Sequence, residues 1–384
     1  MRLKLKGKVV ILSVMKKEIG DYFSNIADPR IERCKEHLLE DILLLSIIAV
    51  ICGCESWETI EDFGKSKIEF LKNYLKLPNG IPSHDTIERL FKRIDSKAFA
   101  KSFIEWADTF RIKREGDFLN IDGKTLCGSK DEGNGKYAIH LVSAWSYQNR
   151  LVLGQVKTSG KSNEIEAVKE LLTLLDIKGA VITADAMSCQ KDIVQLICDK
   201  EADYIIAIKD NHKNLKEAIE YEFKTQPIAI GSKVFRNETL EKSHGRIETR
   251  TCEVINNLTE IENKDSWTNL KNVIKITSIR EIKNVTTKEE RFYISSLNQT
   301  AEYFNTAIRS HWAVENNLHW VLDVQFNEDN SRKRKDNSAE NFAIVRRFAL
   351  TKITQNPLKR YGVNNRRIIA GWNQEYLSKV LEDL

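Results

Sequence analysis

The sequence lacks the features that mark several common classes of protein. Its seven cysteines are odd in number and scattered, and no two are spaced as Cys-x2-Cys, so neither a disulfide framework nor a zinc knuckle is indicated. No apolar run reaches membrane-spanning length; the longest, Ile42–Cys52, has the length of a buried helix. A phosphate-binding loop, a GxGxxG fingerprint and a serine-hydrolase elbow are also absent. These absences predict a protein with reduced thiols and no membrane span.

Length and composition bound the fold. A chain of 384 residues with 41% hydrophobic and 30% charged residues is typical of a soluble globular protein with two or three domains. The basic, apolar N-terminal stretch has no small-residue cleavage site, so we do not expect a signal peptide. The net charge of +5 does not by itself indicate a nucleic-acid partner, but basic residues are concentrated in the C-terminal third.

The pattern is helical over residues 21–110. HLLEDILLLSIIAVICG predicts an apolar helix and SWETIEDFGKSKIEFLKNYL an amphipathic one. Ser83 is expected to cap the next helix, DTIERLFKRI. That short helix carries Arg89, Lys92 and Arg93, which could bind DNA or could form an ordinary solvated face.

The periodicity changes at Asp117. FLNIDGKT, HLVSAWS and LVLGQVKT are typical of three successive strands, and Ser162 is expected to cap the helix NEIEAVKELLTLL that follows them. AVITADAM and DYIIAIKDN are further strands, each followed by a helix. Three antiparallel strands leading into alternating strands and helices predict an α/β fold with a mixed sheet. A β-rich segment, 226–297, then interrupts this pattern.

The segment IRSHWAVENNLHWVLDVQFNED follows that interruption. As an α-helix at 100° per residue it places Glu315 in the middle of an apolar stripe formed by Ile308, Trp312, Leu318 and Leu322. A carboxylate in such a stripe is costly to bury unless it is paired, protonated or bound to a metal. A core Glu paired with an Arg and a functional carboxylate therefore explain this helix equally well.

Two aspartates favour the functional interpretation. Asp122 lies within FLNIDGKT and Asp185 ends AVITADAM, although either could simply cap a turn. Strands one and four of a mixed sheet can lie side by side, which would bring both carboxylates to one edge, and a helix crossing that edge would add Glu315. Three hard oxygen ligands suit Mg²⁺, and two such ions about 4 Å apart can promote phosphoryl transfer.

The histidines on either side of Glu315 suggest a different site. His311 and His319 could bind a transition metal, but the pattern is not HExxH, and residues eight apart on a helix cannot both easily reach one ion. Packing beside Trp312 and Trp320 explains both histidines more simply.

Ten stretches together carry a resemblance to a known family. They are FSNIADPR, LLEDILLLSIIAVICG, PSHDTIERLF, NIDGKT, KSNEIEAVKELL, ITADAMSCQ, DYIIAIKDNH, HGRIETR, RSHWAVENNLHW and DVQFNED. On these motifs the chain resembles bacterial DDE insertion-sequence transposases, specifically the H-repeat-associated transposase family, over nearly its whole length. The resemblance implies a ribonuclease-H-like mixed-sheet catalytic core in which Asp122, Asp185 and Glu315 form the metal-binding catalytic triad, with two Mg²⁺ or Mn²⁺ ions.

The resemblance also implies a domain organisation. The expected parts are an N-terminal appendage (1–20), an all-helical, DNA-binding domain (21–112), the catalytic core (113–225 and 298–355), a β-rich insertion (226–297) and a C-terminal tail (356–384).

One departure concerns the residues around the third acid. Many relatives in the wider superfamily carry Tyr-x2-Arg-x3-Glu-x6-Lys, and here those flanking positions are Ile308, His311 and Leu322. Arg309, His311 or the SRKRK run could supply phosphate contacts instead.

The motif HGRIETR allows two interpretations: one face of this strand could bind a DNA backbone, or the strand could form an exposed edge of self-paired charges. The basic residues expected to contact DNA are Lys124, Lys161, His244, Arg246, Arg250, Arg309, His311, Arg332, Lys333, Arg334, Lys335, Arg346 and Arg347.

The leading functional hypothesis is a transposase that cleaves the ends of its insertion sequence and joins the 3′ hydroxyl to target DNA by two-metal phosphoryl transfer. Its partners would be double-stranded DNA, as terminal inverted repeats and target, and a second copy in a homodimeric synaptic complex, with a cytoplasmic, nucleoid-associated location. A ribonuclease-H-like nuclease and a catalytically idle, transposase-derived DNA-binding protein are the alternatives.

Overall fold

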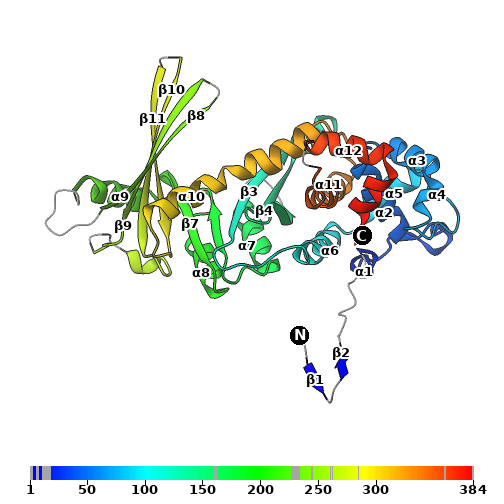
Figure 1. Cartoon of the computed structure of the whole chain (residues 1–384), viewed down its shortest axis with the longest axis horizontal. Helices are drawn as coiled ribbons and strands as arrows, with labels where there is room; N and C mark the ends of the chain where they lie inside the picture. Colours follow the sequence, from blue (N-terminus) through cyan, green and yellow to red (C-terminus); the bar gives the residue numbers. More distant parts are fainter. Residues whose placement is uncertain are drawn as a thin grey trace.

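The structure is a computed structural model that describes residues 3–5, 8–10, 19–158, 163–225, 234–243, 245–259, 261, 263–283, 285–358 and 360–382 (Figure 1). Within that part of the chain, no helix has both the length and the apolar character needed to cross a membrane. Strands β1 (Leu3–Leu5) and β2 (Lys8–Val10) pair with each other as a small antiparallel hairpin that extends away from the rest of the protein (Figure 1).

The N-terminal block is helical, as the sequence predicts. Nearly every residue of the apolar second helix is buried, and the predicted amphipathic stretch divides into two helices, the first closed by a capping box between Ser56 and Thr59. Ser83 Oγ accepts a hydrogen bond from Thr86 N at 3.3 Å, which confirms the predicted cap. The helices are α1 (Ile19–Phe23), α2 (Leu39–Ile51), α3 (Trp57–Ser66), α4 (Ile68–Leu71), α5 (His84–Arg93) and α6 (Ser96–Asp108).

Helices from the C-terminal end of the chain complete this block. They are α11 (Ser338–Gln355), α12 (Val363–Trp372) and α13 (Gln374–Leu381). Helix α11 packs on α2, α5 and α6, and one hydrophobic core joins residues of α1–α6 to residues of α11–α13 (Figure 1). Phe348 of α11, for example, contacts the rings of Phe23, Phe99 and Trp106. The N-terminal helices therefore share their core with segments more than 200 residues away, and the boundary at residue 112 stays a prediction.

A nine-stranded mixed sheet forms the other half of the protein, in the order β5-β4-β3-β6-β7-β11-β10-β9-β8. Strands β3, β4 and β5 are antiparallel, and β6 and β7 run parallel to β3, so the predicted order of strands and helices is confirmed. The elements are β3 (Phe118–Leu126), β4 (Ile139–Ser146), β5 (Leu151–Lys157), α7 (Glu164–Leu174), β6 (Val181–Ala184), α8 (Lys191–Asp199), β7 (Asp203–Ile208) and α9 (Lys213–Thr225).

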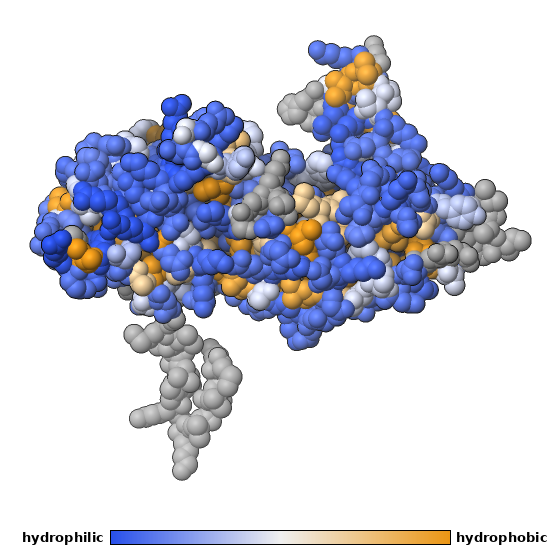
Figure 2. Space-filling view, turned by 180° about the vertical axis from the view of Figure 1, so that it is seen from behind, coloured by the Kyte–Doolittle hydropathy of each residue, from blue (hydrophilic) through white to orange (hydrophobic). Residues whose placement is uncertain are grey.

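The β-rich segment continues this same sheet. Its strand β11 (Val285–Ser295) pairs antiparallel with β7, so the segment joins the core through backbone hydrogen bonds. The other strands are β8 (Val234–Ser243), β9 (Arg246–Ile255) and β10 (Asn272–Ile282). Their far ends project from the body as an arm, which is largely hydrophilic except for an apolar group near its tip (Figures 1 and 2). Leu240, Ile282 and Val285 are among the exposed apolar residues of these strands.

A long helical segment connects the two halves. It begins as α10 (Ala301–His311), which packs on β8, β9, β3 and β6, and continues through two π-helical turns, Glu315–His319 and Val321–Gln325 (Figure 1). Leu318 and Leu322, from the π-helical part, are fully buried in the core of the helical block. This segment therefore passes from the arm, across one face of the sheet, to the helices.

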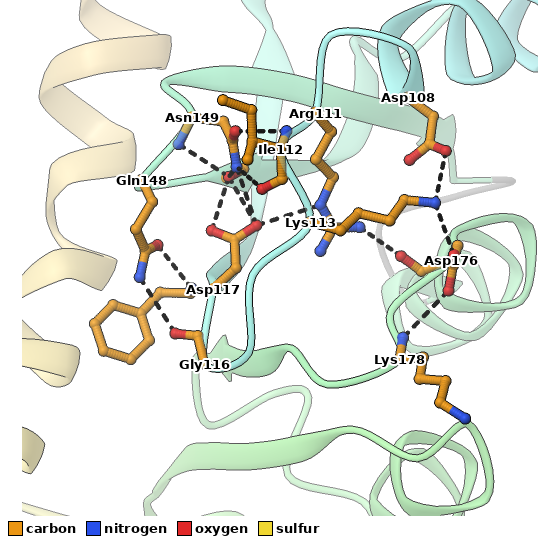
Figure 3. Close-up of polar contacts among 12 residues, drawn as sticks. Asp108, Arg111, Ile112, Lys113, Gly116, Asp117, Gln148, Asn149, Asp176 and Lys178 are labelled. Atoms are coloured by element: carbon orange, nitrogen blue, oxygen red, sulfur yellow. Dashed lines mark hydrogen bonds and ion pairs between the residues drawn. The ribbon is translucent and has the colours of Figure 1, made fainter. Parts of the chain in front are cut away.

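A buried polar network fixes the start of β3 (Figure 3). The Arg111 guanidinium donates to Asp117 Oδ2 at 3.2 Å, and Ser146 Oγ and Asn149 Nδ2 donate to the same carboxylate. Arg111 also donates to the carbonyl of Asp176. Asp117 immediately precedes β3, so this network anchors the strand that carries Asp122 to the turn between β4 and β5 and to the chain before β6.

Candidate active site

The register of β3 and β6 brings two of the predicted acids together. The last paired residues of these parallel strands are Ile121 and Ala184, so Asp122 and Asp185 follow at equivalent positions on the same edge of the sheet. The sequence allowed strands one and four to lie side by side, and in the structure they do. Asp185 directly follows the carboxyl end of β6, a common place for a site, whereas β3 continues to Leu126 and Asp122 lies in its middle, where the pairing with β6 ends.

Glu315 reaches the same place from the first π-helical turn. A cavity of about 350 Å³ is lined by all three acids, together with Thr183, His311 and residues of β7, β11 and α10. The three predicted acids therefore come from two strands and a distant helical segment and open into one cavity.

The π-helical turns change the position of Glu315 from the predicted one. Ile308, Leu318 and Leu322 are buried, but Glu315 is exposed and makes no hydrogen bond or ion pair with any described residue. The predicted α-helical register, which placed Glu315 within the apolar stripe, was wrong. Each π-type turn holds more residues than an α-turn, so the side chains rotate relative to a 100° wheel, and such turns often occur at functional sites.

The acids perturb one another electrostatically. Burial raises the pKa of Asp122 to about 7, and the negative charges of Asp185 and Glu315 raise it further against the lowering effect of a hydrogen bond from Gly123 N. Burial also raises the pKa of Asp185, although that carboxylate accepts hydrogen bonds from the backbone of Met187 and Ser188. A cation in the cavity would relieve both effects because it stabilises the ionised carboxylates.

The donor set fits a divalent cation. Apart from the bond from Gly123 N and contact with His319, the Asp122 carboxylate has no partner among the described residues, and Asp185 uses only Oδ1 in its bonds. No three described His, Cys, Asp or Glu side chains are already gathered closely enough to hold a metal. Glu315 is exposed and unrestrained by a partner, so rotation of its side chain is the adjustment that a metal would require.

A fourth carboxylate that sequence reasoning missed lies beside the acids. Glu164 is the first residue of α7, and its Oε2 lies 3.1 Å from His140 Nε2. A Cβ on Gly123 would lie 2.5 Å from His140 Nε2 and 2.7 Å from Glu164 Oε1, so a larger residue there would require this pair of side chains to shift. The sequence signal was the glycine that directly follows Asp122 in NIDGKT.

Both histidines near Glu315 are uncharged at neutral pH. Burial lowers the pKa of each to about 4. His311 Nδ1 forms a hydrogen bond of 3.0 Å with Thr183 Oγ1, and His319 Nδ1 lies 3.5 Å from Asp122 Oδ2. His311 therefore offers a phosphate at most a neutral hydrogen bond and no positive charge, which departs from its predicted role as a basic contact.

Several predicted DNA contacts are instead buried structural groups. Arg346 pairs with Glu55 at 3.0 Å, and Arg347 pairs with Glu328, with both side chains of the second pair fully buried. Both arginines are buried and each is already paired with a carboxylate, so neither lies on the surface in this structure, and their predicted contact with DNA stays a prediction. Their hydrophobic neighbours on α11 bury them in the core shared with the N-terminal helices.

The SRKRK run divides into two kinds of residue. Lys333 Nζ donates to the carbonyl of Glu55 at 2.5 Å and lies 4.0 Å from the ring centre of Phe342. Arg334 donates to the carbonyl of Gly128 at 3.0 Å. Arg332 and Lys335 are exposed and are the members of the run that remain open to DNA.

The remaining predicted contacts are distributed over the sheet and arm. Lys124 is buried and bridges Asp323 (2.6 Å) and Asp329 (2.7 Å), so its charge is already compensated. Arg246 is exposed and pairs with Glu248 at 3.4 Å, but β9 lies between β8 and β10 and Glu248 is buried, so HGRIETR is not the exposed edge that one interpretation expected. Arg309 pairs with Glu241. Two further predicted residues, Lys161 and His244, and the predicted cap Ser162 lie outside the described residues.

Comparison with known proteins identifies the class. The chain belongs to the Transposase DDE domain family, whose model matches residues 107–352. A second model, DDE_Tnp_1-associated, matches residues 20–107.

Similar proteins agree with this assignment. The chain is 45% identical over 368 residues to "Putative transposase YncI" of Escherichia coli O157:H7, covering 94% of this chain and 93% of that protein. It is 43% identical over 372 residues to "H repeat-associated putative transposase YhhI" of Escherichia coli K12, covering 95% of this chain and 98% of that protein. The resemblance to H-repeat-associated transposases is therefore confirmed.

Proposed function

We propose that this protein is a DNA transposase that cleaves phosphodiesters at the ends of its own element and joins the freed 3′ hydroxyl to target DNA. Membership of the family supports DNA as the substrate. The observation that carries the proposal is the convergence of Asp122, Asp185 and Glu315 on one cavity through the register of β3 and β6.

The arrangement of the sheet supports a ribonuclease-H-like core. Three antiparallel strands precede two strands parallel to the first, and helices alternate with the later strands. Asp122 and Asp185 then lie on strands that are neighbours in the sheet although they are distant in the sequence. A metal site shared between strands requires such an arrangement.

Asp122, Asp185 and Glu315 would hold the divalent ions. Bound Mg²⁺ or Mn²⁺ would activate a hydroxyl nucleophile and neutralise the leaving oxygen. The protein's own contribution is to keep the carboxylates available. His311 and His319 are neutral at pH 7, so neither cancels the negative charge that attracts the cation.

The test is a cleavage and strand-transfer assay with purified protein. The DNA that flanks the gene would first be searched for terminal inverted repeats, and a substrate carrying them would be compared with unrelated DNA of equal length. We expect end cleavage followed by joining, dependent on Mg²⁺ and lost on replacement of any of the three acids. Cleavage of hybrids or branched DNA without joining would instead indicate a nuclease, and binding without cleavage an idle DNA-binding protein.

A further inference from the structure

The face of the arm that α10 covers holds an arginine without a partner. Arg250 lies on β9, opposite Thr239 on one side and Ser278 on the other, and only 7% of its surface is exposed. It makes no hydrogen bond or ion pair with any described residue, and its Nε is buried without an acceptor. A buried N–H group without an acceptor is costly, because nothing replaces the water that Nε lost.

The acids on this face are already committed to other arginines. Cross-strand pairing places Glu241, Glu248 and Glu289 on the same face as Arg250. Glu241 pairs with Arg309, Glu289 pairs with Arg291 at 2.7 Å, and Glu248 lies 3.4 Å from Arg246 and 3.3 Å from Arg280. On this face Arg250 therefore forms no ion pair with a described acid, and only the charge of Glu248 acts on it from beyond ion-pair distance.

Arg250 lies beside the wall of the acidic cavity. Ser278 of β10 lies between Arg250 and Glu289 in the strand register, and Glu289 lines the cavity with Asp122, Asp185 and Glu315. Burial lowers the pKa of Arg250, and the positive charge of nearby Arg309 lowers it further. Arg291, which also lines the cavity, stacks on Trp312 at 4.2 Å. Arginines at the wall of an acidic cavity suit a polyanion that must approach the acids, since their charge offsets repulsion between the phosphates and the carboxylates.

We infer that Arg250, flanked by Arg291 and Arg309, is a binding site for one backbone phosphate of the DNA strand that enters the acidic cavity. A phosphate fits a guanidinium better than a point-like cation does, because two parallel N–H groups can bond two phosphate oxygens. This inference rests on the proposed function and deepens it. Many relatives in the wider superfamily have Arg and Lys where this chain has His311 and Leu322. Arg250 of the arm would supply the basic phosphate contact that these two positions lack.

The test measures DNA affinity without chemistry. Wild-type protein and Arg250→Gln would be titrated with a fluorescent duplex of random sequence, in EDTA, over a series of salt concentrations, with melting temperatures measured in parallel. We expect Arg250→Gln to bind about tenfold more weakly and its log–log salt slope to fall by about 0.9, the value of one phosphate contact. Its melting temperature should stay the same or rise, because the buried unpaired charge is gone. Arg250→Lys keeps the positive charge but loses the two parallel N–H groups of the guanidinium, so its DNA affinity should lie between those of wild type and Arg250→Gln.

Arg347→Gln is the matched control. It makes the same change at a buried arginine that has a partner, so its melting temperature should fall because Glu328 is left unpaired. If Arg250→Gln binds DNA with unchanged affinity and slope, the inference is overturned while the proposed function stands. A fall in melting temperature matching that of Arg347→Gln would show a structural role and also overturn it. Failure of the wild-type protein to bind any duplex would instead count against the proposed function itself.

Discussion

Asp122 and Asp185 follow the last paired residues of two adjacent parallel strands, so the fold holds two carboxylates at one edge of the sheet. Without a cation this arrangement opposes ionisation, and burial together with the neighbouring negative charges raises the pKa of Asp122 to about 7. The stability of the folded protein should therefore depend on pH and on the presence of a divalent metal ion.

The first prediction concerns Asp122 in metal-free protein. Its folded pKa lies above the unfolded value of about 3.9, so its contribution to stability is greatest below pH 4 and is lost as the pH rises towards 7. Asp122→Asn removes this titration. The variant should therefore melt at a higher temperature than wild type in EDTA at pH 8, with the difference shrinking towards pH 4. Mg²⁺ at pH 8 should raise the melting temperature of wild type only. An offset that is constant with pH would contradict the prediction.

The second prediction concerns the choice of third acid. Glu315→Gln should bind DNA normally, since phosphate affinity comes mainly from Lys and Arg, and should cleave about a thousandfold more slowly. Asp323→Asn is the control, because Asp323 lies on the second π-helical turn and pairs with Lys124. It should melt at a lower temperature but keep cleavage within about tenfold of wild type. The reverse result in a gel assay of end cleavage would mean that Asp323 is the third acid.

The third prediction divides the SRKRK run. Replacing exposed Arg332 and Lys335 with Ala should lower the log–log salt slope of DNA binding by up to about 1.8, two phosphate contacts, with little change in melting temperature. Replacing Lys333 and Arg334 should instead lower the melting temperature, because these residues bond the carbonyls of Glu55 and Gly128. Equal salt slopes in both double variants would show that the exposed pair does not touch DNA.

The fourth prediction tests the contact between the chain after β3 and the chain after the π-helical segment. A Cβ on Gly128 would lie 2.5 Å from the carbonyl oxygen of Ser331 and 2.6 Å from that of Asp329, and backbone cannot easily move aside. Gly128→Ala should cost about 1–3 kcal/mol of unfolding free energy in a denaturant titration. Gly133→Ala, where the nearest atom would be 3.7 Å away, should be nearly neutral. Similar losses in both variants would rule out the steric explanation.

The sequence by itself determined the elements and their order. Apolar periodicity of two and of 3.6 residues depends on the residues within one segment, so β3–β7, their helices and the cap at Ser83 were predictable. The same order made the adjacency of β3 and β6 one of the few arrangements that a mixed sheet allows, and the register of these strands in the structure places Asp122 and Asp185 at equivalent positions.

Only the tertiary structure decided how single side chains are used. The orientation of Glu315 depends on π-helical turns that bury Leu318 and Leu322 in a core supplied by residues at both ends of the chain. The same core buries Arg346 and Arg347, which look like surface charges in the sequence, and the pairing of β11 with β7 joins the strands that carry Arg250 to the catalytic sheet. Burial and ion pairing are sums over contacts between distant segments, and a local pattern carries no information about those contacts.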